Sequence, residues 1–286
     1  MVGMVADSAS ALEPSVLAAE GVRLVPLLLE AGGRSVPETE LDESEISHLL
    51  ASGRARTASP PPGAFLKAIE AADDGEGVVV LTVGSRYSSS ADAARLAAAQ
   101  SESLVEVVDT GSAAGGQALV VLSTASAART GLALDALAKH ANEVSRRVRL
   151  VAEVGDLTQL ARSGRLPRRL ASLGNTVGVR PVFELRSGSI RLLRPGLSKR
   201  SALTLIIDTW RRSIVADHRL HVVAMHGGDR ARAEEILEAV LNEAHPATSL
   251  ITRFGPAMIA HTGTETDGLA WWWEPVSGRL EDGETA

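Results

Sequence analysis

The chain has 286 residues, of which 45% are hydrophobic and 22% are charged, and its formal net charge at pH 7 is −6. This composition is typical of a folded protein, and the length suits two lobes that each bury a core. The chain contains no cysteine, which excludes disulfides, thiolate catalysis and zinc sites built on cysteine. No segment approaches the roughly 18 consecutive apolar residues of a membrane span, and the amino terminus lacks a signal-peptide pattern, so we expect a cytoplasmic protein.

In its first half, the chain alternates strand-like apolar runs with helical patterns. The expected strands are residues 2–6, 22–28, 77–83 and 103–108, and the expected helices are residues 14–20, 42–52, 62–72, 90–100 and 132–148. Such alternation predicts a mostly parallel sheet that helices cover on both faces. Ligand sites in sheets of this kind lie at the carboxyl ends of the strands.

The second half has a different pattern, with a predicted boundary near Arg149. Its expected strands are residues 150–154, 221–226, 249–254, 256–261 and 269–273, with helices at 199–217 and 230–243 and an antiparallel hairpin of 176–185 and 189–194 around Ser187–Gly188. We therefore predict a two-lobed α/β protein, with a mostly parallel sheet in lobe 1–148, a mixed sheet in lobe 149–275, and an acidic tail at 276–286.

Charge is unevenly distributed along the chain. Residues 146–200 contain thirteen Lys and Arg residues but only three acids, so this segment carries about +10 while the remainder carries about −16. A basic segment can serve a nucleic acid, an anionic membrane or an acidic partner protein, or it can be a solvated arginine-rich face. Composition does not choose among these alternatives.

Four segments rich in Ser, Thr and Gly are predicted to follow strands. They are residues 7–10, 56–65, 84–90 and 261–264. Helix capping explains one hydroxyl in such a loop, but three serines precede the helix expected at Ser90. The prolines of the second segment predict a stiff, irregular loop that holds Thr57 and Ser59 in fixed directions. Backbone N–H groups at a helix start favour an anion, and the imidazole of His261 can donate a hydrogen bond to one.

In order and spacing, these segments resemble the DegV family of bacterial fatty-acid-binding proteins. The matching motifs are Val5-Ala6-Asp7-Ser8, Thr57 to Pro61, Gly84 to Ser90, Val108 to Gln117, Leu160 to Arg165, Arg180 to Gly188, and Gly255 to Gly263. Together they span the chain from Val5 to about Trp273. The resemblance implies a fatty acid in a tunnel between the two lobes.

The same resemblance implies a head-group site and a partner. Carried over by position, Thr57, Ser88 and His261 hold the fatty acid carboxylate, with Ser59, Ser89 and Thr262 as neighbouring candidates. In the family, a fatty acid kinase phosphorylates this carboxylate, and the acyl phosphate passes to phospholipid synthesis. The binding protein itself needs no metal or cofactor and catalyses no reaction.

The sequence departs from the family pattern at several positions. Alanine at 58, glycine at 84, tyrosine at 87, serine at 89 and leucine at 197 replace the residues expected there. At residue 89 a serine side chain occupies a position where glycine would allow close backbone approach, so the extra hydroxyl either joins the head-group site or shifts it.

Two other functions compete with this interpretation. A serine esterase would use Ser88 as nucleophile, His261 as base and Asp7 or Asp109 to orient the base, although the serine loop lacks a Gly-x-Ser-x-Gly elbow. A nucleotide or nucleic-acid binder would use the basic segment or the Gly111–Gly116 loop. The chain has no phosphate-loop motif and only 3% aromatic residues, which disfavours this class.

The tryptophan run, three polar residues and the arginine-rich stretches lie outside the head-group site. The run Trp271–Trp273 resembles a membrane-interface anchor, but consecutive strand residues alternate faces, so at least one should be core, and we favour core or a contact between the lobes. Residues Asp109, Gln117 and Asp156 are structural candidates. The arginine-rich stretches Arg162–Arg169 and Arg191–Arg200 are hypothesised to dock the kinase or, transiently, an anionic membrane.

Overall fold

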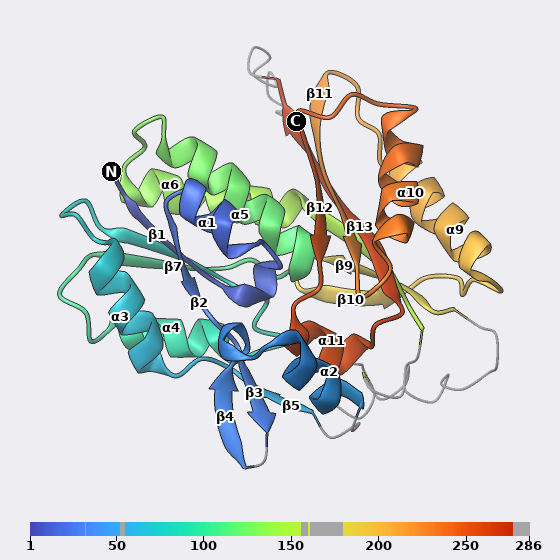
Figure 1. The fold of residues 1–286 in the computed structure, drawn as a ribbon. Coiled ribbons are helices and arrows are strands. Elements are labelled where there is room, and N and C mark those ends of the chain that lie inside the picture. The colour runs from blue at the N-terminus through green and yellow to red at the C-terminus, as the bar shows by residue number, and fades with distance from the viewer. Residues whose placement is uncertain (32, 52–54, 156–159, 161–179, 277–286) are drawn as a thin grey trace.

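The computed structural model describes residues 1–31, 33–51, 55–155, 160 and 180–276. Their strands form three sheets, of four, six and three strands. In Figure 1 the four-stranded sheet lies on the left, the six-stranded sheet on the right, and the three-stranded sheet below them beside α2 (Glu43–Ala51) and α11 (Pro256–Thr262). None of the helices in the described part of the chain combines the length and the apolarity that crossing a bilayer requires.

The four-stranded sheet is entirely parallel, in the order β2-β1-β6-β7. Its strands are β1 (Gly3–Asp7), β2 (Val22–Val25), β6 (Val78–Thr82) and β7 (Val105–Asp109). Side chains of β6 alternate between two cores, because Val78 and Val80 pack on one face while Val79 and Leu81 pack on the other. β-Branched residues buried on both faces are what a central parallel strand requires.

Helices cover both faces of this sheet. They are α1 (Pro14–Ala19), α3 (Pro62–Ala72), α4 (Ser90–Ala98), α5 (Ala114–Ala128) and α6 (Leu134–Arg147). Phe65 and Ile69 of α3 pack with Ala94 of α4 on one face. The helices α5 and α6 cover the other face, so the predicted doubly covered sheet is confirmed.

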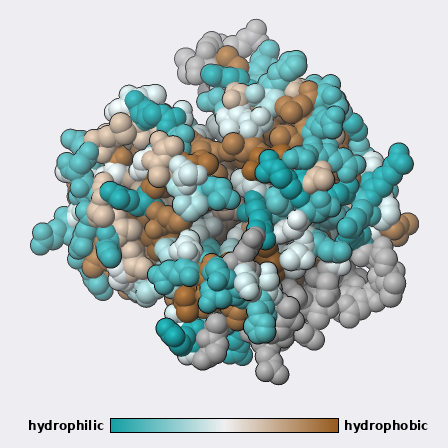
Figure 2. Space-filling view, in the orientation of Figure 1, coloured by the Kyte–Doolittle hydropathy of each residue, from teal (hydrophilic) through white to brown (hydrophobic). Residues whose placement is uncertain are grey.

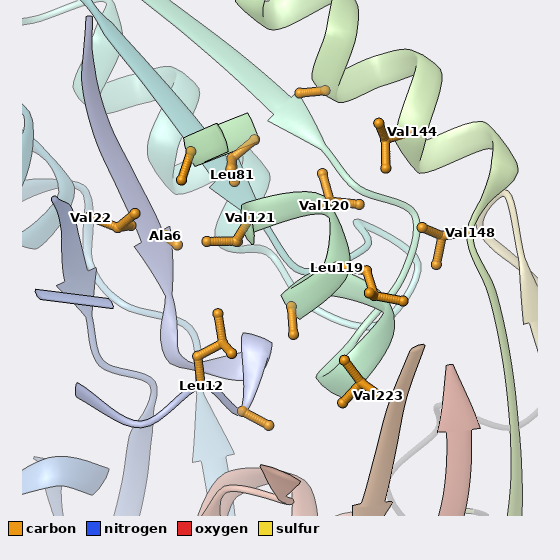
Figure 3. Packing of buried hydrophobic residues seen from close by; sticks show 14 of the residues in the cluster. Ala6, Leu12, Val22, Leu81, Leu119, Val120, Val121, Val144, Val148 and Val223 are labelled. Atoms are coloured by element: carbon orange, nitrogen blue, oxygen red, sulfur yellow. The ribbon is translucent and has the colours of Figure 1, made fainter. Parts of the chain in front are cut away.

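The helix α5 joins the two larger sheets, and no sequence pattern predicted it. Leu119, Val120 and Val121 are buried around its circumference, and Figure 3 shows them between Leu81 of β6 and Val223 of the six-stranded sheet. A helix without a polar face has no amphipathic period, which removes the usual sequence signal. The glycines near its start also suggested a loop.

The six-stranded sheet is mixed, in the order β10-β9-β8-β13-β11-β12. Its strands are β8 (Arg149–Val154), β9 (Val182–Arg186), β10 (Ser189–Leu192), β11 (His218–His226), β12 (Thr248–Arg253) and β13 (Thr266–Pro275), with β11 and β12 as its parallel pair. The helices α9 (Lys199–Arg211) and α10 (Arg230–Leu241) cover one face. This confirms both the mixed sheet and the hairpin turn at Ser187–Gly188.

The tryptophan run belongs to the core, as expected. Trp271 packs under α9 and α10, whereas Trp272 points to the opposite face of β13 and joins the core around α5. Their exposed fractions are 0% and 3%. Strand alternation thus gives each side of the sheet one large aromatic anchor.

Expectations about local structure were wrong in two regions of the chain. The segment from Arg56 was predicted as an irregular loop, but Arg56–Ala58 forms β5 in a small antiparallel sheet with β3 (Leu28–Ala31) and β4 (Arg34–Pro37). The reason is that the prolines begin only at Pro60, so the three preceding residues keep their N–H groups for pairing with β3. The expected strand 22–28 is also divided: β2 ends at Val25, and Leu28 starts β3.

The second error concerns the segment 256–261, which was predicted as a strand. It forms the helix α11, so His261 lies in a last helical turn and not at a strand end. A short apolar run does not distinguish strand from helix. Here Pro256 occupies the first helical position, and the helix ends at Gly263 with φ of 77°.

Candidate functional site

A cavity lies where β5, the loop before α4, and α11 approach β8, β9 and β10. The empty volume between its walls is about 990 Å³, which includes open solvent at the mouth. Sixteen of its described lining residues are apolar: Ala9, Leu27, Ala58, Val83, Ala113, Ala114, Leu150, Ala152, Val154, Leu160, Phe183, Leu185, Ile190, Phe254, Ala257 and Met258. No Asp, Glu, Lys or Arg of the described residues lines it. Such a cavity suits a ligand with a large apolar part.

One wall of the cavity is a continuous apolar surface from the six-stranded sheet. Leu150, Ala152 and Val154 alternate along β8, so all three point to the same face. Phe183 and Leu185 on β9 extend this face. The surface offers area without hydrogen-bonding groups, which is how an acyl chain is held. Figure 2 shows hydrophobic residues gathered between the hydrophilic outer parts of the molecule.

The polar lining residues are Thr57, Ser59, Tyr87, Ser88, His261, Thr262 and Thr266. Thr57 lies on β5 and Ser59 just after it, while Ser88 lies in the loop before α4. His261 and Thr262 are in the last turn of α11. The structure therefore brings together five of the six candidate head-group residues from three separate segments.

Two pairs of these residues are linked by hydrogen bonds. The Thr57 hydroxyl and Nε2 of His261 lie 2.7 Å apart, and the Ser59 and Ser88 hydroxyls lie 2.8 Å apart. All four residues are partly buried and line the cavity, so a ligand there can contact them. Hydroxyl groups and an imidazole can together satisfy a carboxylate that has left water.

Ser89, the sixth candidate, lies outside the described lining. Its side chain is exposed, and its backbone N–H donates to the Ser59 hydroxyl at 3.1 Å. The φ of Ser89 is −84°, so a side chain at this position causes no backbone strain. Its contribution to the cavity is thus to fix Ser59 through the main chain.

Behind the lining, the serine hydroxyls continue into the protein. Ser88 Oγ lies 2.9 Å from Ser90 Oγ, and the buried Ser90 lies near Asp7 and lowers the pKa of its carboxyl group. Asp7 accepts hydrogen bonds from Gln117 at 2.8 Å and from the N–H of Val83 at 2.9 Å. Asp7 is completely buried, and this desolvation raises its pKa to about 6 despite the hydrogen bonds.

The position of α11 depends on Glu38, a residue that no sequence pattern indicated. Glu38, on the short helix η2 (Glu38–Glu40), accepts a hydrogen bond from the N–H of Ala257 at 2.8 Å, in the first turn of α11. Its other carboxyl oxygen accepts from the Ser8 hydroxyl. Burial raises the pKa of Glu38. The contact joins residues 219 positions apart, so no local pattern could have revealed it.

Asp109 and Gln117 have the structural roles expected of them. The Asp109 carboxylate accepts from the N–H of Ser85 at 3.1 Å and of Gly111 at 2.9 Å, which ties the loops after β6 and β7 together. Gly111 has φ of 59° and approaches Gly188 closely. A Cβ on Gly111 would lie only 2.8 Å from the backbone nitrogen of Gly188. Asp156, the third structural candidate, lies outside the described residues.

The geometry around Ser88 and His261 differs from that of a hydrolase triad. His261 is paired with Thr57, whereas Ser88 is paired with Ser59 and Ser90. A triad needs the imidazole on the nucleophile hydroxyl and a carboxylate on the other ring nitrogen. The two carboxylates considered for that role, Asp7 and Asp109, instead accept hydrogen bonds from the groups described above.

Only part of the basic segment 146–200 lies among the described residues. Arg162–Arg169 lies outside the described residues, while Arg191, Arg194, Lys199 and Arg200 are exposed. Part of the charge is neutralised, because the buried Glu184 lies 2.5 Å from Arg149 and 2.6 Å from Arg191. The guanidinium groups hold the pKa of Glu184 below its usual range although burial opposes this.

Comparison with known proteins gives consistent matches over nearly the whole chain. A family model described as uncharacterised protein, DegV family, matches residues 1–274. A DegV domain-containing protein of Mycobacterium bovis is 28% identical over 272 residues, covering 93% of this chain and 95% of its own. Another, of Staphylococcus aureus, is 25% identical over 270 residues, covering 93% and 96%.

Solved structures show the same fold. A fatty-acid-binding DegV family protein from Thermus thermophilus has a TM-score of 0.87 and 26% identity, covering 95% of this chain and 99% of that one. DegV from Bacillus subtilis, described as a fatty acid binding protein, has a TM-score of 0.81 and 20% identity, covering 96% and 99%. The expected two-lobed α/β fold is confirmed by these matches.

Proposed function

The chain belongs to the DegV family, and on that premise we propose that it binds a long-chain fatty acid, with the acyl chain in the apolar cavity and the carboxylate at its hydroxyl-rich end. The observation that carries this proposal is the division of one cavity into an uncharged apolar wall and a cluster of hydroxyls with one imidazole. The Thermus thermophilus relative, described as a fatty-acid-binding protein, supports the same ligand class.

The energetics favour a chain-like amphiphile. Each CH₂ group that leaves water contributes about 0.8 kcal/mol, so roughly ten buried CH₂ groups contribute about 8 kcal/mol before the entropic cost of binding. The hydrogen bonds of the carboxylate to protein replace those to water, so each contributes only about 1.5 to 3 kcal/mol net. We therefore assign affinity to the apolar wall, and orientation to Thr57, Ser88 and His261, with Ser59, Ser89 and Thr262 as supporting groups.

The finer part of the proposal concerns the fate of the bound fatty acid. We propose that the chain is a carrier in the cytoplasm that presents the carboxylate to a fatty acid kinase for acyl-phosphate formation, and so feeds phospholipid synthesis. This rests on the family resemblance and on the presence of hydroxyls and one imidazole in the cavity lining. In this role the protein binds and orients, while the kinase supplies ATP and the phosphoryl-transfer chemistry.

The exposed arginines of Arg191–Arg200 are the part of the basic segment that we propose docks the kinase or an anionic membrane. Replacing Arg194 and Arg200 by Glu is expected to reduce kinase-dependent acyl-phosphate formation, or association with vesicles containing phosphatidylglycerol, by tenfold or more. Arg34→Glu, an exposed change on β4, is the matched control. If both measurements stay at the wild-type value, this surface has neither role.

Mass spectrometry of a solvent extract from gently purified protein tests the binding proposal. We expect one fatty acid per chain, and an increase in melting temperature when delipidated protein is given a long-chain fatty acid. An empty cavity together with an unchanged melting temperature for fatty acids of ten to twenty carbons would contradict it. Turnover of a chromogenic acyl ester that is lost in Ser88→Ala would instead support the esterase alternative.

A further inference from the structure

A second pocket, the arginine pocket, lies on the face of the six-stranded sheet that α9 covers. Its described lining residues come from β8, from β10 and the residues after it, and from α9 and the residue after it: Arg149, Arg191, Leu193, Arg194, Leu205, Thr209 and Arg212. Neighbouring residues of β8 point to opposite faces of the sheet, so Leu150 lines the apolar cavity whereas Arg149 lines the arginine pocket. The empty volume of this pocket is about 860 Å³, which includes open solvent.

The arginine pocket has an excess of positive charge. Four of its described lining residues are arginines, and no Asp or Glu of the described residues lines it. The carboxylate that contacts these arginines is Glu184 on β9, which is buried and accepts hydrogen bonds from Arg149 at 2.5 Å and from Arg191 at 2.6 Å. One carboxylate against four guanidinium groups leaves a net charge of +3. Among the described residues, no acid neutralises Arg194 or Arg212.

The strand register places a further positive charge beside this pocket. Arg149 of β8 lies directly opposite Arg186 of β9 in the antiparallel ladder. Like charges in opposite positions destabilise a sheet, and Glu184 offsets only part of this repulsion. An anion bound next to Arg149 would offset the rest. The register therefore supports a bound anion independently of the pocket's lining.

Two of the four lining guanidinium groups are held in place. The Arg149 side chain is only 19% exposed, donates to Glu184 through both Nε and Nη2, and lies over the Trp271 ring at 5.1 Å from its centroid. Nη2 of Arg212 donates to the Thr209 hydroxyl at 3.3 Å. A guanidinium group has five N–H donors, so both arginines keep donors for a ligand. Donors that are already ordered lose less conformational entropy when the ligand binds.

We propose that the arginine pocket is a second ligand site, which binds a phosphate monoester through the arginines that line it. A phosphate monoester carries nearly two negative charges at neutral pH and has three acceptor oxygens, which suits several guanidinium groups with a net charge of +3. A carboxylate offers one charge and two oxygens. Leu193 and Leu205 place apolar surface beside the arginines, where the organic group of the ester can pack. This site goes beyond the proposed fatty acid binding and does not depend on it.

Calorimetric titration of the full chain with phenyl phosphate at pH 7.5 tests the proposal. Phenyl phosphate is expected to bind about tenfold or more tightly than phenyl sulfate, which has a similar shape but only one negative charge. Raising the NaCl concentration from about 50 mM to about 500 mM is expected to weaken binding, because salt screens the attraction between the charges. Equal affinities for the two esters would overturn the assignment to a phosphate monoester.

Variants locate the binding site. Arg212→Gln and Arg149→Gln are each expected to raise the Kd for phenyl phosphate about tenfold or more, because each removes charged hydrogen-bond donors. Arg211→Gln is the matched control, since Arg211 is exposed beside Arg212 but pairs with Asp208 and Glu243 outside the pocket lining.

Urea denaturation shows whether each variant is folded, and Arg212 is exposed, so its replacement is expected to leave the midpoint unchanged. Unchanged affinity for phenyl phosphate in folded Arg212→Gln would overturn the site. Decanoate binding by the same variant is expected to equal that of wild type, because the apolar cavity lies on the other face of the sheet. The two sites can therefore fail separately.

Vesicles distinguish a soluble ligand from a lipid head group. Phosphatidylcholine vesicles that contain about 10 mol% phosphatidate display a phosphate monoester at their surface. Cosedimentation with these vesicles that is lost in Arg212→Gln would assign the site to a lipid head group. Binding of phenyl phosphate without such cosedimentation would assign it to a soluble phosphate monoester. Absence of binding to both probes would overturn the proposal and leave the fatty acid function intact.

Discussion

Thr57 and His261 lie 204 positions apart in the chain, yet their side chains meet at 2.7 Å. Both residue types were identified from the sequence, because hydroxyls and an imidazole beside apolar runs indicate an oxyanion site. Their pairing could not be predicted, since Thr57 was assigned to a loop and His261 to a strand end. The antiparallel pairing of β5 and the formation of α11 decide which atoms meet.

At the residue scale, His261→Gln is expected to raise the Kd for decanoate about tenfold or more. The reason is that hydrogen bonds to a charged group contribute roughly 1.5 to 3 kcal/mol when their loss leaves that group unsatisfied. Thr57→Val is expected to weaken binding in the same direction. Isothermal titration measures both, and Ser85→Ala, an exposed change in the neighbouring loop, is the control that should stay within about twofold. Equal affinities for all four proteins would contradict the head-group assignment.

At the scale of elements, α11 is a short helix whose start is fixed by another part of the fold. Glu38 offers its carboxylate to the first turn, where an anion is favoured by the helix dipole, and its link to Ser8 ties η2 to the end of β1. From the sequence, His261 was correctly expected beside a glycine turn, but it was assigned to a strand end instead of a helix. A short apolar run such as Ala257–Ala260 satisfies strand and helix equally until a capping partner is present.

Glu38→Ala is expected to lower the free energy of unfolding by about 1 to 2 kcal/mol, because it removes the cap of α11. It is also expected to weaken fatty acid binding several-fold, since His261 lies in the last turn of the same helix. Urea denaturation and calorimetry provide the two readouts. Glu40→Ala, an exposed acid on the same short helix η2, is the matched control. A Glu38 variant with wild-type stability would show that the cap is not needed.

At the scale of the molecule, buried carboxyl groups determine how stability depends on pH. Glu153 on β8 is completely buried opposite Asp267, and burial raises its pKa to about 7 although Arg180 and Arg232 lie at 3.9 Å. Desolvation therefore outweighs the two cations. The folded-state pKa values of Glu153 and Asp7 exceed their ordinary values. Between about pH 4 and about pH 7, the folded state therefore binds more protons than the unfolded state.

Stability of the ligand-free protein is consequently expected to fall as pH rises from about 4 to about 7. Each unit of pKa difference corresponds to about 1.4 kcal/mol, so the loss attributable to Glu153 is on the order of 1 to 3 kcal/mol. Chemical denaturation at pH 5 and at pH 8 measures it. Glu153→Gln is expected to reduce the difference between the two values, whereas Glu102→Gln, at an exposed carboxyl, should leave it unchanged. A stability that rises between pH 5 and pH 8 would contradict this account.

The sequence by itself determined the alternation of strands and helices, the mixed second sheet and the burial of the tryptophans, because these follow from local period and side-chain size. It also identified the hydroxyls and the histidine of the candidate site. Only the tertiary structure decided that α5 joins both sheets, that Glu38 caps α11, and that the hydroxyls of Ser59, Ser88 and Ser90 meet. Those contacts join segments up to 219 positions apart, so they contribute to stability only once the chain has folded.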